Sequence, residues 1–327
     1  MHLIIPYAAS HVLNDPKVLT GLQLPHLQAL LSLMQRQQVL PAPLSEHDLH
    51  MPHERLHASA LGWNGQASAL PWAAWHSAQN GQPSTSPQAW ITPCHWQVGM
   101  DQVVMLDPAS LFLTDDESRQ LLQAMQPYLL EDGLQVTWHS ALAWHAEGTL
   151  LAQLPTASLD RVVGQNVKPW LTDSPTAHPM HRLQSEMQML LYNHPVNDAR
   201  EARRQHTVNS FWLHGAGALP NAAAPPTSSS QRITVPDTQR IAVPDTLRAS
   251  AMRGDVQAWQ QAWQTLDATV LADALAHLKS SGQATLSLCS ENTAHTYQAI
   301  PLAWHQRVAR FFNPTTPVTA LQALLTP

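Results

Sequence analysis

The most constraining feature of the sequence is its opening, where a short apolar run is followed by an apolar pattern of helical period. Residues 2–8 form an apolar run that ends in small residues, as a buried first strand does. Leucine and methionine then recur at helical spacing from Leu22 to Met34, and Pro25 lies near the start, where a helix tolerates proline. A strand, a loop and a helix in this order predict an α/β core.

A compact unit of short strands and one helix is expected after a turn-rich segment at 79–88, which is typical of a linker. Thr114 followed by Glu117 predicts a helix N-terminus, and the helix is expected to run to about Tyr128. The expected strands of this unit are 96–98, 103–106, 134–138, 143–146 and 150–154, the last two forming a hairpin. This order predicts a small α+β domain inserted into the core.

The rest of the chain alternates predicted helices with buried strands, as a second stretch of α/β core does. Residues 218–232 are rich in Ala, Pro and Ser and predict a flexible linker, and similar octads at 233–240 and 241–248 indicate a local duplication. The expected elements are a helix at 181–192, a strand at 210–213, a helix at 256–279, a strand at 284–289 and a helix at 317–325. The predicted division is 1–90 for the first part of the core, 91–180 for the inserted domain, 181–217 for a return helix, loop and core strand, 218–232 for the linker and 233–327 for the second part of the core.

Charge argues against a nucleic-acid or membrane partner. Only 12% of the residues are charged and the formal net charge is −6, so the chain has no general attraction to anionic polymers or lipids. No window approaches the roughly 18 apolar residues of a membrane span, and the N-terminus lacks the basic and apolar regions of a signal peptide. The distant cysteines, Cys94 and Cys289, are typical of free thiols in a reducing compartment. We therefore expect a cytoplasmic protein.

One short motif suggests a metal. His53-Glu54-Arg55-Leu56-His57 matches H-E-x-x-H, which on a helix places two imidazoles on one face for Zn²⁺ and a glutamate as general base. Pro52 immediately before it predicts that the helix begins there, whereas a zinc site of this kind lies within a helix. A solvated helix start is the favoured interpretation, and a zinc hydrolase that uses His53 and His57 is the alternative.

The densest polar segment, 194–204, joins a predicted helix to a buried strand, where α/β folds often place ligand-binding loops. Arg200, Arg203 and Arg204 would form a fork for a phosphate or carboxylate. In the structural alternative, Asn197 and Asn209 hold the loop backbone and the arginines stay solvated. Both interpretations remain open, and the candidate ligand-binding residues are His194, Asn197, Arg200, Arg203 and Asn209.

Motifs in this region also carry a family resemblance. The motifs are His194-Pro195-Val196-Asn197, Arg200, Asn209 and Trp212-Leu213-His214-Gly215-Ala216-Gly217. Together they resemble the His-Pro-Val-Asn…Arg…Asn…Trp…Gly-x-Gly stretch of the archaeal-type cofactor-independent phosphoglycerate mutases. The 95–155 unit is similar to that family's inserted domain, and residues 24–30 resemble one of its helices. At 92–101, 156–161 and 183–191 the chain more closely resembles a bacterial branch, the RpfE-type regulatory proteins.

The resemblance implies an α/β fold of the alkaline-phosphatase superfamily, with a degenerate core sheet, helices on both faces and a small inserted α+β domain. It also implies two metal ions held by Asp and His, and a Ser that takes the phosphoryl group. The chain departs from this pattern at the expected metal ligands. The place of the first metal-binding Asp holds Pro6-Tyr7-Ala8-Ala9, an Asp-Pro-His stretch has become Ala157-Ser158-Leu159, and the late strand ends in Leu288-Cys289-Ser290-Glu291-Asn292.

Two-metal phosphoryl transfer cannot run without ligands that hold the metal ions. We therefore expect a pseudoenzyme that regulates or binds a metabolite, with no metal cofactor. Its expected partner is a phosphorylated or carboxylated small molecule or a regulatory protein. The alternatives are a divergent phosphomutase or phosphatase that uses Mn or Zn, and the zinc hydrolase described above.

Overall fold

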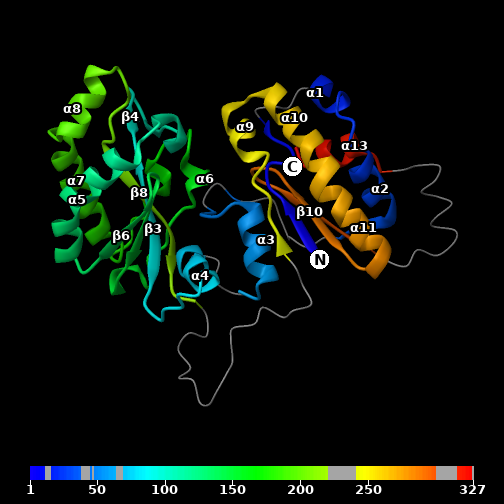
Figure 1. Ribbon diagram of the computed structural model, residues 1–327, viewed down its shortest axis with the longest axis horizontal. Helices are drawn as coiled ribbons and strands as arrows, with labels where there is room; N and C mark the ends of the chain where they lie inside the picture. Colours follow the sequence, from blue (N-terminus) through cyan, green and yellow to red (C-terminus); the bar gives the residue numbers. More distant parts are fainter. Residues whose placement is uncertain are drawn as a thin grey trace, which may run out of the picture. The chain divides into compact units, whose positions relative to one another are not determined.

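The computed structural model describes residues 1–11, 16–37, 45, 48–63, 69–219, 241–299 and 315–325, and the chain divides into two units. The first unit comprises Met1–Glu46, Met51–Trp63 and Ser230–Pro327, and the second comprises His47–His50 and Asn64–Ser229 (Figure 1). The second unit therefore interrupts the first in the sequence. Within the described ranges, no helix has the length and apolar character needed to cross a membrane.

A five-stranded sheet in the order β2-β11-β10-β1-β9 forms the centre of the first unit. Strand β1 (His2–Ile5) pairs in parallel with β10 (Thr285–Cys289) and with β9 (Ile241–Ala242). Strand β11 (Ala294–Ala299) runs antiparallel to both β10 and β2 (Met34–Gln37). The beginning and the end of the chain thus share one sheet (blue and orange in Figure 1). All four residues of β1 are buried, as in a central strand.

Helices cover both faces of this sheet, which confirms the predicted α/β core. The described helices of the unit are α1 (Pro16–Thr20), α2 (Pro25–Leu33), α3 (Pro52–Ala60), α9 (Arg248–Arg253), α10 (Val256–Leu266), the π-helical turn η5 (Asp267–Leu271), α11 (Ala272–Ser281) and α13 (Pro317–Gln322). On one face, Leu3 and Ile5 belong to a core shared with α2, α10, α11 and α13. On the other face, Ile4 and Cys289 pack with Leu56 of α3.

The second unit is α+β and contains a four-stranded antiparallel sheet in the order β6-β7-β3-β8. Its strands are β3 (Gln88–Cys94), β6 (Gln135–Ser140), β7 (Ala143–Glu147) and β8 (Ser210–Gly217). Alternate residues such as Ile91 and Trp144 pack against α5 (Asp115–Glu131), α7 (His178–Tyr192) and α8 (Pro195–Ala202). These residues form the core of the unit.

Helix α4 (Trp72–Gln79) lies on the opposite face of this sheet, against β3 and β8. The approach is close, because a Cβ atom built on Gly215 would lie 3.2 Å from the Cβ of Trp72. Gly215 also has a φ of +62°, which side chains disfavour. The remaining elements are β4 (Trp96–Val98), β5 (Val103–Met105), α6 (Leu159–Val162) and the 3₁₀ turns η2 (Pro108–Leu111), η3 (Thr149–Leu151) and η4 (Lys168–Trp170).

Several local predictions are confirmed and others are wrong. Thr114 and Glu117 form the expected reciprocal cap at the start of α5. The strand expected at 150–154 is absent, because η3 begins there and the hairpin is made by β6 and β7. The single helix expected at 256–279 is interrupted by the π-helical turn.

The division between the units also differs from the predicted one. Strand β8 pairs with β3, so the segment 181–217 belongs to the second unit and does not return to the first sheet. The segment 79–88 lies within the second unit and does not separate two domains. Most of the expected linker, 220–232, and the first octad, 233–240, lie outside the described residues. The second octad begins with β9.

Candidate functional site

The carboxyl ends of β1 and β10 lie next to each other because the strands are parallel, with Ile5 opposite Leu288. Open α/β sheets place their ligand-binding residues at this edge. The backbone N–H of Ala8 donates to the carbonyl of Cys289 at 2.7 Å, and Tyr7 has a φ of 53°. Such a left-handed backbone is uncommon for tyrosine, so the contacts around it must hold the turn after β1.

Glu291 supplies a carboxylate at this edge, and both of its oxygens accept hydrogen bonds from the loop after β1. The hydroxyl of Ser10 donates to Oε1, and the backbone N–H of His11 donates to Oε2 at 3.3 Å. A serine hydroxyl bonded to a carboxylate is the first requirement for an activated nucleophile. Ser10 is only 1% exposed, however, so the pair mainly anchors the loop to the end of β10.

One face of α10 fixes the same edge from inside the core. The indole N–H of Trp259 donates to the carbonyl of Tyr7 at 3.1 Å, and that of Trp263 donates to the carbonyl of Ala8 at 3.2 Å. One further turn along, the Asp267 carboxylate accepts the backbone N–H of Leu27 at 2.8 Å, at the start of α2. The two indoles are fully buried. Trp259, Trp263 and Asp267 follow one another at intervals of four residues. This spacing is the sequence signal that would have predicted their shared role in contacting the turn after β1 and the start of α2.

Two buried indoles and the Glu291 carboxylate thus hold the turn after β1, where the family resemblance implies metal ligands. Tyr7, Ala8 and Ala9 offer no carboxylate or imidazole, and burial raises the pKa of the Cys289 thiol far above its usual range. Among the residues that the structure describes, no three or more His, Cys, Asp or Glu side chains are placed to hold one metal ion.

The H-E-x-x-H motif lies at a helix start, as predicted, but this start is not solvated, because residues 52–57 are buried or half-buried. Helix α3 begins at Pro52, and the Glu54 carboxylate accepts the backbone N–H of Met51 at 2.7 Å, which is the glutamate half of a capping box. The glutamate that a zinc hydrolase would use as general base therefore serves as a helix cap. Burial, with the neighbouring His53 and His2, lowers the pKa of His57 to about 4.

In the second unit, Asn197 and Asn209 hold backbone, as the structural alternative predicted. The Asn197 amide donates to the carbonyls of Leu191 and Val208, each at 2.8 Å, and accepts the Val208 N–H at 2.9 Å. Asn209 pairs in the same way with both backbone groups of Trp96, at 2.7 and 2.9 Å. Each amide thus ties two segments together and uses its donor and acceptor internally.

The segment around Arg200 is a helix, α8, and not the expected loop. His194 caps this helix, its ring Nδ1 accepting the N–H of Val196 at 3.2 Å. Because α8 turns one face toward the core, Val196, Asn197 and Arg200 are buried while Arg203 and Arg204 are exposed. The three arginines therefore do not converge on one solvent-facing fork.

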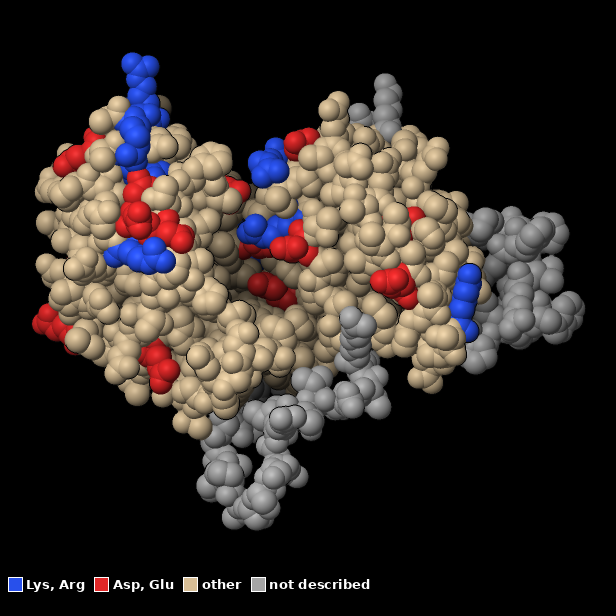
Figure 2. All heavy atoms as spheres, viewed as in Figure 1, with Lys and Arg blue, Asp and Glu red and all other residues tan. Residues whose placement is uncertain are grey.

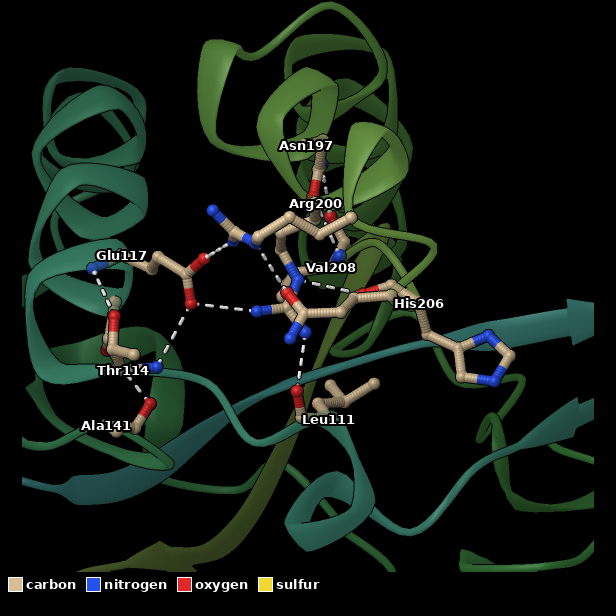
Figure 3. A network of polar contacts seen from close by, with 11 residues as sticks. Leu111, Thr114, Glu117, Ala141, Asn197, Arg200, His206 and Val208 are labelled. Carbon is tan, nitrogen blue, oxygen red and sulfur yellow. Dashed lines mark hydrogen bonds and ion pairs between the residues drawn. The ribbon is translucent and has the colours of Figure 1, made fainter.

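Arg200 is fully buried and lies at the centre of a polar network (Figure 3). Its guanidinium donates to Glu117 Oε2 at 2.8 Å, to the carbonyl of Leu111 at 2.5 Å and to the carbonyl of His206 at 2.8 Å. Arg203 donates to the other oxygen of Glu117. The guanidinium of Arg200 thus binds groups of the protein itself, including the Glu117 carboxylate 83 residues away, a pairing that the sequence did not predict.

Residues 154–157 border a small cavity in the second unit. The cavity has a volume of about 40 Å³, and its lining includes Thr156, Ala157, Trp170, His181 and Trp212. A single water needs roughly 10–15 Å³ of such volume, so the cavity has room for a few waters. It is too small for a phosphorylated metabolite.

Charged side chains form no broad patch of one sign on the face shown in Figure 2. Basic and acidic side chains occur singly or in small groups, some of them of mixed sign, and uncharged residues cover most of the described surface in this view. This surface follows from the charged content of 12%.

Comparison with known proteins finds similar solved structures at low sequence identity. The cofactor-independent phosphoglycerate mutase from Thermoplasma acidophilum DSM 1728 is 12% identical, with 91% of this chain and 88% of that chain covered and a TM-score of 0.36. The PH0037 protein from Pyrococcus horikoshii is 10% identical, with 91% and 86% covered and a TM-score of 0.44. No family model matches the sequence, and no curated protein matches it.

Proposed function

We propose that this chain is a phosphoglycerate-mutase-like protein without two-metal catalysis, which acts as a regulatory or metabolite-binding protein. The observation that carries the proposal is the composition of the edge formed by β1 and β10. Where the sequence resemblance implies a metal-binding Asp, Tyr7 and Ala8 present carbonyls to two buried indoles. The Glu291 carboxylate at that edge accepts two internal hydrogen bonds. We further propose that the protein belongs to the RpfE-type regulatory branch and works in the bacterial cytoplasm.

Loss of phosphoryl transfer follows from the charge of such a reaction. The transferred phosphoryl group carries negative charge on its oxygens, and metal ions neutralise this charge in the two-metal enzymes. Among the described residues that directly follow β1 and β10, the carboxylate is that of Glu291, which is bonded to Ser10 and His11. A site of this kind has too few ligands to hold two divalent ions.

Metal analysis of the purified full-length chain tests the proposal. We expect less than one equivalent of Mn or Zn per chain, and no phosphatase or mutase turnover after either metal is added. The reason is the lack of a convergent ligand set among the described residues. Two equivalents of metal together with turnover would overturn the proposal in favour of a divergent phosphomutase. One zinc that is lost in His57→Ala but kept in the matched variant His181→Ala would instead favour a zinc hydrolase.

A thermal-shift measurement with phosphoglycerate tests metabolite binding. A ligand that binds only the folded protein stabilises it by about 2.7 kcal/mol at 100 times its Kd, so the Tm should rise without added metal. Because Arg200 is buried, Arg203 and Arg204 are the arginines of this segment that reach solvent. We expect the double variant Arg203→Ala/Arg204→Ala to lose the shift, with sulfate at equal ionic strength as the control. A shift that persists would remove both arginines from the site, and no shift in the native chain would contradict binding of this ligand.

A further inference from the structure

Three imidazoles surround one indole on the face of the four-stranded sheet that carries α4, opposite the core formed with α5 and α7. The Trp90 ring centroid lies 5.1 Å from that of His76, 5.2 Å from that of His139 and 5.4 Å from that of His145. The rings of His76 and His139 also meet edge to face, with centroids 5.4 Å apart. These four residues come from α4, β3, β6 and β7, so the cluster, which we call the imidazole cluster, joins four elements.

Two contacts between α4 and the β6–β7 half of the sheet use histidines of the imidazole cluster. His76 of α4 packs on His139 of β6, and the Ser77 hydroxyl lies 3.1 Å from Nε2 of His145 on β7. Gln88 of β3 holds the same nitrogen of His145 at 3.1 Å. Helix α4 has only eight residues, contains no Asp, Glu, Lys or Arg, and has no side-chain cap at its N-terminus. A helix this short depends on tertiary contacts.

Few other charges face the imidazole cluster. Among the described residues, the titratable side chains of α4 and of the strands on this face are His76, His139, His145, Glu147, His214 and Cys94. Within this set Glu147 is the single carboxylate against three imidazoles, so their full protonation leaves net positive charge. Burial, with His139, lowers the pKa of His76. Burial also lowers the pKa of His145. The charge of Glu147 raises this pKa, whereas the neighbouring His139 and His76 lower it further.

We propose that the imidazole cluster is a proton-sensitive lock that holds α4 on β6 and β7 at neutral pH and releases it on acidification. Neutral imidazoles pack edge to face on Trp90 and on one another. Protonated rings at these separations repel one another across a partly buried contact. Histidine is the side chain suited to such a change between neutral and mildly acidic pH.

Hydrogen exchange of the full-length chain tests the lock. The exchange rates are expressed as protection factors, which correct for the effect of pH on the intrinsic rate. Between about pH 7.5 and about pH 5.5 we expect protection of the α4 amides to fall roughly tenfold or more, while protection of α5 stays unchanged. In the double variant His76→Phe/His139→Phe, which keeps two packed rings without titratable groups, the fall should disappear. The matched variant His178→Phe, on the exposed start of α7, should behave as the native chain.

An equal fall of protection in α4 and α5, no fall in α4, or an undiminished fall in the double variant would overturn the proposal. If the double variant does not fold, a histidine NMR titration of the native chain decides. The α4 amide shifts must then follow the titration of the His76 ring or of the His139 ring, and α4 shifts that follow neither ring would overturn the lock.

Discussion

Replacing Arg200 with Ala is expected to lower the free energy of unfolding by about 3–5 kcal/mol, the usual cost of breaking a buried ion pair. Without the guanidinium, the Glu117 carboxylate loses its buried partner, and the carbonyls of Leu111 and His206 lose their donor. Unsatisfied buried acceptors cost free energy beyond the ion pair itself. Urea denaturation followed by circular dichroism measures the change.

Arg203→Ala is the matched control, because Arg203 binds the same carboxylate from the surface with 51% of its side chain exposed. Exposed ion pairs contribute about 0–1 kcal/mol, so this variant should unfold close to the native midpoint. A loss below about 1 kcal/mol in Arg200→Ala, or equal losses in both variants, would contradict the assigned role of Arg200. Such results would also reopen Arg200 as a ligand-binding residue.

Ionisation of Glu117 should make the free energy of unfolding depend on pH in the acid range. Partial burial raises the pKa of Glu117, but the Thr114 N–H and the charges of Arg200 and Arg203 outweigh this and leave the pKa below its usual value. A carboxyl with a lowered pKa stabilises the fold above its unfolded pKa and loses this contribution as pH falls through the folded value. As pH falls through this range, the free energy of unfolding should therefore decrease less in Arg200→Ala than in the native chain.

Acidification from about pH 7 to about pH 5 is expected to cost roughly 2 kcal/mol of stability for each of His2 and His57, before coupling between them is considered. Burial lowers the pKa of both imidazoles to about 4, from an ordinary 6.5. The unfolded chain takes up these protons below pH 6.5, whereas the folded chain does so only near pH 4. Stability is thus full above pH 6.5 and falls with pH across this window.

Unfolding free energies at several pH values separate this effect from the titration of carboxylates. In His57→Gln, the loss of stability between about pH 7 and about pH 5 should shrink by roughly 2 kcal/mol, whatever the variant's stability at neutral pH. His11→Gln is the control, because His11 lies in the same unit and is exposed. A native-like pH dependence in His57→Gln would contradict the assignment of the acid sensitivity to His57.

The residues that carry the family resemblance make contacts that hold the structure of the second unit. Asn197 and Asn209 each pair with the two backbone groups of another segment, and His194 caps α8. Arg200 joins that helix to Glu117 of α5. A motif that resembles an enzyme's can therefore persist because it holds the fold of the second unit together.

The sequence by itself determined the local elements of the protein. Apolar period and capping residues placed the buried first strand, the start of α5 at Thr114 and the start of α3 at Pro52. The structure confirms all three, although the strand predicted from the run 2–8 ends at Ile5. These features depend on residues within a few positions of one another, so their physical causes can be read locally. The absence of Asp from Pro6-Tyr7-Ala8-Ala9 is equally a property of the sequence.

Only the tertiary structure decided which of these elements meet. The pairing of β8 with β3, the burial of Arg200 on Glu117 and the contact of Trp259 with the Tyr7 carbonyl join residues far apart in the chain. An exposed fork of arginines and a buried ion pair between one arginine and a carboxylate can arise from the same spacing of arginines in the sequence. They differ only in what packs against the arginines. Because hydrophobic burial is non-directional, and hydrogen bonds form with whichever groups packing brings within reach, local patterns do not specify these partners.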